Sequence, residues 1–467
     1  MVQSEGQNSA NSKTAGQAVV RDVVCAGCAD LCDDLQLDIE QKRIVGINVD
    51  CPGARDFFLD YRIEQISPMI RGSEVAWDEA LEEAANVLSH AKSPLIAGLS
   101  STAGEAQRRA VEVAELLGGC LDVPYAAFYG SRALAFQEIG ESSCTLGEVR
   151  NRADLVIFWG SEPRETHPRH LARYALDPPG MFVPRGRKDR TLIVVDVQRT
   201  PTAEEADLFL HMRADEDYEV LAALRARLNG STLDVEEVAG IPVKELDSLL
   251  ERMRGCRYGI VFYGTGLSMS RGWEQNILAL LLLEHDLNAF TRFNVMAMRG
   301  PLGFANAAGA FKLLTWQTGY PFAVSFARGF SQYNPGEFTA SELLERRGVD
   351  AALVVGADPL AYLPPQAAAV LKNLPTVVLA PRLNESAKAA TVFFPTATYG
   401  IGAKGTMFRM DRIPLRLRRV VDSPLPTDES VLLQLLSRLH DLQAQTASPR
   451  TRELRTDLRL LKEMRGL

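Results

Sequence analysis

The sequence predicts an α/β protein built on parallel β-sheets, and two observations carry the prediction. Apolar runs of about four to six residues, each bounded by Gly, Pro or Asp, recur along the 467-residue chain. Such runs are typical of strands that are buried on both faces of a parallel sheet. Segments with helical spacing of apolar residues separate the runs, and this alternation indicates α/β domains.

The expected elements follow a regular order along the chain. A polar stretch at 1–18 is predicted to be a disordered tail. Short strands are expected first at 35–39 and 44–49, and then at 95–99, 155–159, 192–197, 259–263, 352–355 and 377–379. Helices are expected at 77–91, 105–117, 217–228, 273–283 and 430–442.

The chain contains a weak internal repeat. Each copy is a strand followed by a glycine, then a second strand that ends near an arginine, then a short strand with a phenylalanine. Loops at the carboxyl ends of parallel strands are where open sheets bind nucleotides, so two related half-sites facing one ligand are expected. The alternative is the ordinary recurrence of strand and loop in any α/β chain. The candidate cofactor-binding residues, including one glycine after a further strand, are Gly160, Asp196, Arg199, Gly264, Gly356 and Arg382.

Composition and charge exclude several classes of protein. Lys and Arg number 51 against 59 Asp and Glu, a net charge of −8, which argues against a nucleic-acid-coating protein. The longest apolar run, at 277–283, is far shorter than the about 20 residues of a membrane span. The N-terminal segment lacks the apolar stretch of a secretory signal. We therefore expect a cytoplasmic protein without membrane or nucleic-acid partners.

Four of the seven cysteines lie in one short part of the chain. Cys25, Cys28 and Cys32 are separated by two and three residues, and Cys51 follows on a separate segment. Four thiolates suit a [4Fe–4S] cluster or a tetrahedral zinc ion. Zinc sites usually come as two close pairs, so the triplet favours the cluster. Four buried thiols without a metal are the third interpretation.

Two of the six histidines, His167 and His170, lie close together in the sequence. Pro168 between them makes a metal-binding pair on a helix unfavourable, and no further Cys or His is close in sequence. We therefore expect both histidines to form hydrogen bonds in a loop.

Five segments carry a resemblance to a known family. They are CAGCADLCDD at 25–34, the stretch at 144–170, MRG at 298–300, TWQTGYPF at 315–322 and YNPGE at 333–337. These segments resemble those of the B subunit of formylmethanofuran dehydrogenase, a molybdopterin (molybdenum or tungsten) oxidoreductase, and the resemblance spans about residues 20 to 420. It implies a formate dehydrogenase-like fold, with a small N-terminal cluster-type domain and two related parallel-sheet α/β domains.

The resemblance also suggests where the domains divide. A cysteine domain is expected at 19–70, and a first α/β domain at 71–150 with parts of 300–345. A second, nucleotide-binding-like α/β domain with the first copy of the repeat is expected at 151–300. The second copy and a pterin-pocket-like part are expected at 346–425, and C-terminal helices at 426–467.

Two departures from the family concern its metal site. The family binds tungsten or molybdenum through a cysteine followed by histidine, and here Phe128 and Tyr129 stand in those places. The family's active-site loop reads Arg-Gly-His, and here it runs from Arg299 to Pro301. A phenyl ring offers no lone pair to a metal, and proline has no titratable group. The comparison implies a degenerate site without catalytic residues or a tungsten or molybdenum pterin, and it makes the six loop residues vestigial.

The same profile resembles the B subunit of the bacterial formyltransferase/hydrolase complex. That family transfers a formyl group from formyl-tetrahydromethanopterin to a methanofuran-like carrier and hydrolyses it to formate. The expected function is a non-redox scaffold subunit, partnered by an amidohydrolase-like A subunit, a C subunit and a formyltransferase D subunit, with the carrier nearby. The alternative is an active tungsten or molybdenum formylmethanofuran dehydrogenase subunit with an unusual metal ligand. A stand-alone iron–sulfur carrier fits a chain of this length less well.

Overall fold

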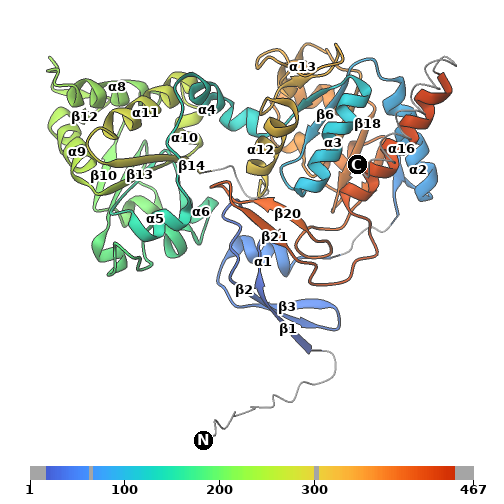
Figure 1. Ribbon diagram of the computed structural model, residues 1–467, viewed down its shortest axis with the longest axis horizontal. Coiled ribbons are helices and arrows are strands. Elements are labelled where there is room, and N and C mark those ends of the chain that lie inside the picture. Colours follow the sequence, from blue (N-terminus) through green and yellow to red (C-terminus); the bar gives the residue numbers. More distant parts are fainter. Residues whose placement is uncertain (1–16, 63–66, 299–303, 447–467) are drawn as a thin grey trace, which may run out of the picture.

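The computed structural model describes residues 17–62, 67–298 and 304–446. Two α/β bodies lie side by side, and a small N-terminal unit lies below them in the view of Figure 1. Most of the tail predicted at 1–18 lies outside the described residues, and its last two positions begin strand β1 (Gln17–Val23). Within the described ranges, no helix is long and apolar enough to cross a membrane.

The larger body is built on a nine-stranded sheet in the order β16-β15-β7-β6-β17-β18-β19-β4-β5. The five central strands, β7 to β19 in this order, pair in parallel, whereas the outer strands pair antiparallel. The central strands are β6 (Pro94–Gly98), β7 (Cys120–Asp122), β17 (Ala351–Val355), β18 (Thr376–Ala380) and β19 (Val392–Pro395). The outer strands are β4 (Met69–Ile70), β5 (Ser73–Glu74), β15 (Val324–Ser325) and β16 (Gln332–Tyr333).

Helices from distant parts of the chain cover this sheet. Helix α16 (Asp428–Thr446) packs on α2 (Trp77–His90) and α3 (Gly104–Leu117), and α3 packs on α12 (Ala307–Thr318). Shorter helices are α13 (Ala340–Glu345), α14 (Pro365–Leu371), α15 (Glu385–Ala389) and the 3₁₀ turn at Pro359–Ala361. Because β6 pairs with β17, the segments at 71–150 and 346–425 share one sheet rather than forming separate ones.

The smaller body is built on a fully parallel sheet in the order β10-β9-β8-β13-β14. Its strands are β8 (Leu155–Trp159), β9 (Thr191–Asp196), β10 (Leu208–His211), β13 (Tyr258–Tyr263) and β14 (Arg292–Ala297). Helix α4 (Tyr125–Ile139) leaves the larger body and packs on α11 (Trp273–Leu287) of the smaller one.

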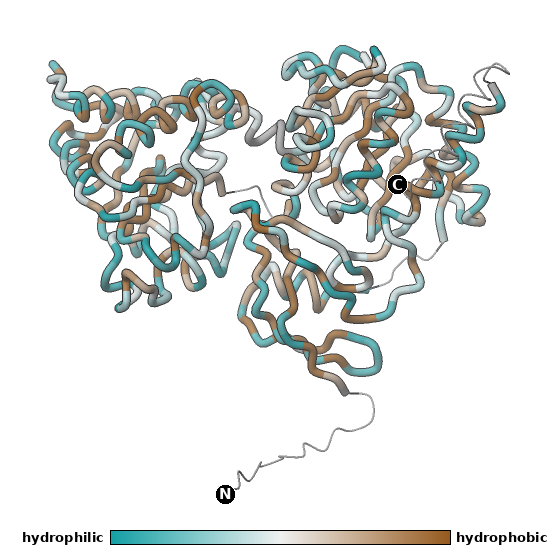
Figure 2. The backbone as a smooth tube through the Cα atoms, viewed as in Figure 1, coloured by the Kyte–Doolittle hydropathy of each residue, from teal (hydrophilic) through white to brown (hydrophobic). Residues whose placement is uncertain are grey.

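The other elements of the smaller body are short or peripheral. They are α5 (Leu146–Arg152), α6 (Pro163–Thr166), a π-helix (Leu171–Ala175), a 3₁₀ turn (Gly186–Asp189), α7 (Pro201–Glu204), α8 (Asp217–Leu228), β11 (Glu237–Val238), β12 (Ile241–Pro242), α9 (Val243–Gly255) and α10 (Thr265–Ser268). In both bodies the apolar residues gather inside and the polar residues outside (Figure 2).

The two copies of the repeat have the same local geometry. In each copy three strands lie side by side in parallel, β8-β9-β10 in one sheet and β17-β18-β19 in the other. The glycine after the first strand has a positive φ in both, 53° at Gly160 and 57° at Gly356. Its N–H donates to the second strand, at Val195 and Leu379 respectively, over 2.9 Å in each case.

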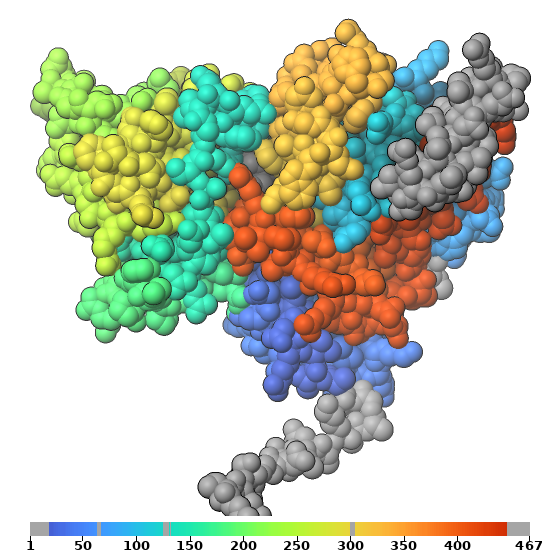
Figure 3. Space-filling model, in the orientation of Figure 1, coloured from blue at the N-terminus to red at the C-terminus, as the bar shows by residue number. Residues whose placement is uncertain are grey.

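The N-terminal unit contains β1, β2 (Leu35–Glu40), β3 (Arg43–Ile47) and helix α1 (Pro52–Phe58). Its apolar side chains pack with Ile401 and Val421, which flank the hairpin of β20 (Gly405–Phe408) and β21 (Pro414–Leu417). Figure 3 shows this unit, in blue, directly against the red C-terminal segment. The N-terminal unit is thereby attached to the region of the hairpin, which itself packs on α3 and α12 of the larger body.

Candidate metal centre and its surroundings

The four predicted ligand cysteines come together in the structure. Cys25, Cys28 and Cys32 lie in the loop between β1 and β2, and Cys51 immediately precedes α1. All four line one small pocket, which is completed by Leu35, Gly53, Ala54 and Arg169. The four cysteines that are grouped in the sequence therefore also lie around one pocket in the structure.

The backbone explains how the loop reaches the helix. The N–H of Cys25 donates to the carbonyl of Cys32 over 2.8 Å, which closes the loop on itself. A Cβ added at Gly27 would lie 2.6 Å from the carbonyl oxygen of Gly53, so only glycine allows this approach. The contact brings the triplet beside the segment that carries Cys51.

The thiols of this site are costly to ionise without a positive partner. Burial raises the pKa of Cys25 to about 12, against a smaller opposing effect of the Gly27 N–H. Burial likewise raises the pKa of Cys28 and of Cys32 well above the ordinary value. All seven cysteines are free. Because thiolates are the form that binds metal, a bound metal would supply the charge that these sulfurs lack.

Four thiolates are the donor set of a [4Fe–4S] cluster and also of a structural zinc ion. In a zinc site all four sulfurs lie about 2.3 Å from one ion. A cubane binds each thiolate to a different iron, so its sulfurs stand farther apart. Across the described residues no group of three or more His, Cys, Asp or Glu side chains is arranged to hold a metal ion.

Buried polar groups lie behind the cysteine loop. Nδ1 of His170 lies 2.9 Å from Oδ1 of Asp30, and both side chains are almost wholly buried. His167 Nδ1 lies 3.0 Å from the hydroxyl oxygen of Thr166, and burial lowers the pKa of His167 to about 4. The hydrogen-bonding role expected from the sequence for these two histidines is confirmed. Asp30 was not identified from the sequence as the partner of His170. The available signal was an acidic residue between two of the cysteines, because such a residue needs a cation or a hydrogen-bond donor as its partner.

A second pocket adjoins the cysteines and contains two of the six predicted loop residues. It has a volume of about 270 Å³ and is lined by Gly356 and Arg382 together with Gly27 and Gly53 of the N-terminal unit. Asp428 also lines it and was not predicted, because its sequence context is that of any acidic residue in the first turn of a helix.

Asp428 is a buried carboxyl in the wall of this second pocket. The Thr102 hydroxyl donates to its Oδ2 over 2.5 Å. Burial raises the pKa of Asp428 to about 6, against the opposing effect of nearby hydroxyl groups. A carboxyl group that titrates in this range can accept or donate a hydrogen bond to a polar ligand near neutral pH.

The other four loop residues belong to the smaller body. Gly160 and Gly264 pack directly together, since a Cβ at Gly264 would lie 2.4 Å from the carbonyl oxygen of Gly160. Asp196 ends β9, and burial raises its pKa. The Arg199 guanidinium lies 5.4 Å from the centre of the Phe209 ring. The six residues thus form two groups at the carboxyl edges of two sheets, and only Gly356 and Arg382 adjoin the cysteines.

The positions predicted to be degenerate are described only in part. Positions 128 and 129 lie in helix α4, with side chains outside the described features, and Arg299 and Pro301 lie outside the described residues. The next residue of α4, Gly130, lines a pocket of about 340 Å³ with Trp273 and Phe322. Burial raises the pKa of Asp122, in the same pocket, to about 7. The pocket beside Gly130 therefore lies between the larger and the smaller body.

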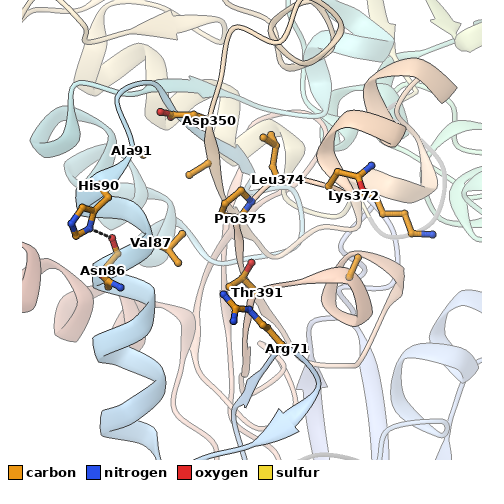
Figure 4. A pocket seen from close by; sticks show the side chains of 13 residues that line it. Arg71, Asn86, Val87, His90, Ala91, Asp350, Lys372, Leu374, Pro375 and Thr391 are labelled. Atoms are coloured by element: carbon orange, nitrogen blue, oxygen red, sulfur yellow. Dashed lines mark hydrogen bonds between the residues drawn. The ribbon is translucent and has the colours of Figure 1, made fainter.

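A larger hollow, of about 730 Å³, lies at the opposite edge of the nine-stranded sheet (Figure 4). Its lining includes Asp350, Pro375 and Thr391, which come directly before β17, β18 and β19. His90 Nδ1 lies 2.9 Å from the carbonyl oxygen of Asn86 on the same helix. Open parallel sheets bind ligands at the carboxyl ends of their strands, so the cysteine side is the better candidate site.

Comparison with known proteins identifies the family. No family model matches the chain. The chain is 40% identical over 435 residues to the B subunit of the tungsten-containing formylmethanofuran dehydrogenase 2 of Methanocaldococcus jannaschii, covering 91% of this chain and 99% of the relative. It is 25% identical over 299 residues to the B subunit of the formyltransferase/hydrolase complex Fhc of Methylorubrum extorquens, covering 62% of this chain and 74% of the relative.

Solved structures show the same fold. The crystal structure of the formyltransferase/hydrolase complex FhcABCD from Methylorubrum extorquens with methylofuran contains a chain with a TM-score of 0.67 and 24% identity, over 81% of this chain and 99% of that one. Acetylene hydratase from Pelobacter acetylenicus gives a TM-score of 0.66 at 14% identity, over 90% and 69% of the two chains. With 40% identity along nearly the whole length of a curated relative, the chain belongs to the family of formylmethanofuran dehydrogenase B subunits.

Proposed function

We propose that this chain is a non-redox structural subunit of a complex that transfers a formyl group and hydrolyses it to formate. The observation that carries the proposal is Phe128, which stands where the resemblance places the metal-binding cysteine. A phenyl ring cannot ligate tungsten or molybdenum. Tyr129 in the following place lacks the imidazole that the redox family has there.

The other cysteines do not compensate for this loss. Cys120 is buried in β7 and packs among apolar side chains that include Leu343 and Ala352. Cys144 is buried in the core of the smaller body, where burial raises its pKa to about 12. A thiol held protonated in an apolar core is a poor metal ligand.

Likeness to the B subunit of the Fhc complex supports the same proposal. That relative is named as part of a formyltransferase/hydrolase complex, and its complex has been solved with methylofuran. For this chain we propose partners of the corresponding kinds: an amidohydrolase-like A subunit, a C subunit and a formyltransferase D subunit, with a methanofuran-like carrier nearby. Transfer and hydrolysis would take place on those partners.

We further propose that Cys25, Cys28, Cys32 and Cys51 hold one [4Fe–4S] cluster with a structural role. The N-terminal unit is small, with three strands and a short helix. Metal binding contributes folding free energy to such a unit when its own core is limited. A structural role explains why the ligands persist where the tungsten ligand does not.

A second candidate is an active tungsten or molybdenum formylmethanofuran dehydrogenase subunit with an unusual ligand. The observation in its favour is the 40% identity to a tungsten-containing relative, which exceeds the 25% identity to the B subunit of the Fhc complex. Overall sequence identity reflects the shared fold, however, whereas metal binding depends on a few positions.

Metal analysis of the native complex separates the two candidates. The complex is isolated without oxygen through a tag on this chain, and tungsten, molybdenum and iron are measured per chain. We expect iron without stoichiometric tungsten or molybdenum, together with formyl hydrolysis and no dye-linked formate oxidation. One tungsten or molybdenum per chain with dye-linked formate oxidation would establish the second candidate instead.

A further inference from the structure

Three acidic residues lie within or directly after the cysteine triplet, and all contact one segment of the smaller body. Asp30 lies between Cys28 and Cys32, and Asp33 and Asp34 follow directly. Their partners come from residues 167–174, between α6 and the end of the π-helix. The cysteine loop is therefore attached to the smaller body by the residues that neighbour its sulfurs.

Arg169 makes the contact closest to the cysteines. Its Nη1 and Nη2 donate to the two carboxylate oxygens of Asp34 over 2.7 and 2.8 Å. The Arg169 side chain is only 20% exposed and lines the same pocket as the four cysteines. Such a two-point bond fixes the plane of the guanidinium, so its charge is held beside the sulfurs.

Two further contacts complete this attachment. Arg173 pairs with both Asp33 and Asp34. The buried Asp30–His170 contact lies behind the loop, and Ala29 packs with Leu171 and Tyr174 in the core of the smaller body. Arg173 also pairs with Asp34 but does not line the cysteine pocket. A substitution of Arg173 is therefore a matched control for the same substitution of Arg169.

The charge at the site requires a cation. A [4Fe–4S] cluster held by four thiolates carries net negative charge, and its one-electron reduction adds another. The surrounding carboxylates add more, and a buried negative group without a positive partner is unstable. Within the described residues, Arg169 is the cationic side chain that lines the pocket.

We propose that Arg169 is a positioning residue for the cluster, holding the cysteine loop through Asp34 and compensating the negative charge of the thiolate-bound cluster. The inference rests on the cluster proposed above. It makes cluster retention depend on a residue of the smaller body that lies 118 or more positions from the ligands along the chain. The contact that docks the N-terminal unit on the smaller body thereby also stabilises the cluster.

The test compares three variants in the native complex: Arg169→Gln, Arg169→Lys and Arg173→Gln. The readouts are iron per chain, the rate of iron loss to a chelator, and the midpoint potential from a dithionite titration followed by electron paramagnetic resonance. We expect Arg169→Gln to lose iron about tenfold faster and to shift the midpoint potential to more negative values, because the reduced form loses its compensating cation. Arg169→Lys should restore part of both, and Arg173→Gln should have a smaller effect.

The possible failures are distinguishable. If the wild-type complex holds no iron, and none binds on reconstitution with iron and sulfide, the cluster itself is wrong and this inference with it. If the wild type holds the cluster and Arg169→Gln changes neither the chelation rate nor the potential, only the role of Arg169 is wrong. Equal effects of Arg169→Gln and Arg173→Gln would also overturn it, since any cation of the segment would then suffice.

Discussion

His170 and Asp30 form a buried contact, 2.9 Å between Nδ1 and Oδ1, across the junction of the smaller body and the cysteine loop. The two residues are 140 positions apart in sequence, and both side chains are at most 1% exposed. Burial alone would raise the pKa of Asp30, but the contact with His170 and the nearby Arg409 outweigh it, so the pKa lies below its ordinary value. The carboxylate is therefore held ionised inside the protein.

Removal of this carboxylate should destabilise the junction. Asp30→Ala leaves the His170 imidazole buried without its partner, and we expect a loss of about 3 kcal/mol in the free energy of unfolding. Asp38→Ala, on the exposed face of β2 in the same unit, is the control and should change it by about 0.5 kcal/mol or less. Urea denaturation of both variants measures the difference. Equal effects would show that the buried contact contributes nothing specific.

Removal of a ligand cysteine should remove iron from the site. In Cys28→Ala one of the four thiolates is lost, and we expect iron in the purified complex to fall to a small fraction of the wild-type content. Cys256→Ser changes a free cysteine in the smaller body and should retain the wild-type content. Collapse of the N-terminal unit together with iron loss would show a structural cluster. An intact complex without iron would show that the cluster is dispensable.

The repeat glycines should tolerate substitution poorly for a stated steric reason. Gly356 has φ 57°, and a Cβ there would lie 2.9 Å from the backbone nitrogen of Thr102. Gly319→Ala is the control, because φ is 85° there but no atom lies within 4 Å of the new Cβ. We expect a cost of about 1 kcal/mol for Gly319→Ala and about 3 kcal/mol for Gly356→Ala. Thermal denaturation that gives the same cost for both would exclude the steric explanation.

Glu284 should make the protein less stable as the pH rises. This side chain is 2% exposed, and burial raises its pKa from 4.5 to about 8. Between about pH 4.5 and about pH 8 the folded state keeps a proton that the unfolded state has released, so stability falls with rising pH in this window. Glu284→Gln should match the wild type near pH 4.5 and exceed it at pH 8. The variant of the exposed Glu251, Glu251→Gln, should have the wild-type stability at both pH values. A stability of Glu284→Gln that changes with pH in parallel with the wild type would contradict the raised pKa of Glu284.

Several elements were predictable because their signal is local. The strands at 155–159 and 259–263 coincide with β8 and β13, since a short apolar run bounded by breakers is the pattern of a buried parallel strand. Helix α4 was not predicted. Apolar and aromatic residues occur all around it, so it lacks the one-sided stripe that marks a surface helix.

The sequence by itself determined the α/β class and the grouping of four cysteines, because each is written in local composition or spacing. The correspondence of Phe128 to a metal-ligand position comes instead from the resemblance to the family. Only the tertiary structure decided that β6 and β17 share a sheet, and that Arg169, His170 and Asp428 surround the cysteine loop. Strand partners and ion pairs between distant segments depend on how the elements pack in space. Periodicity along the chain carries no record of that packing.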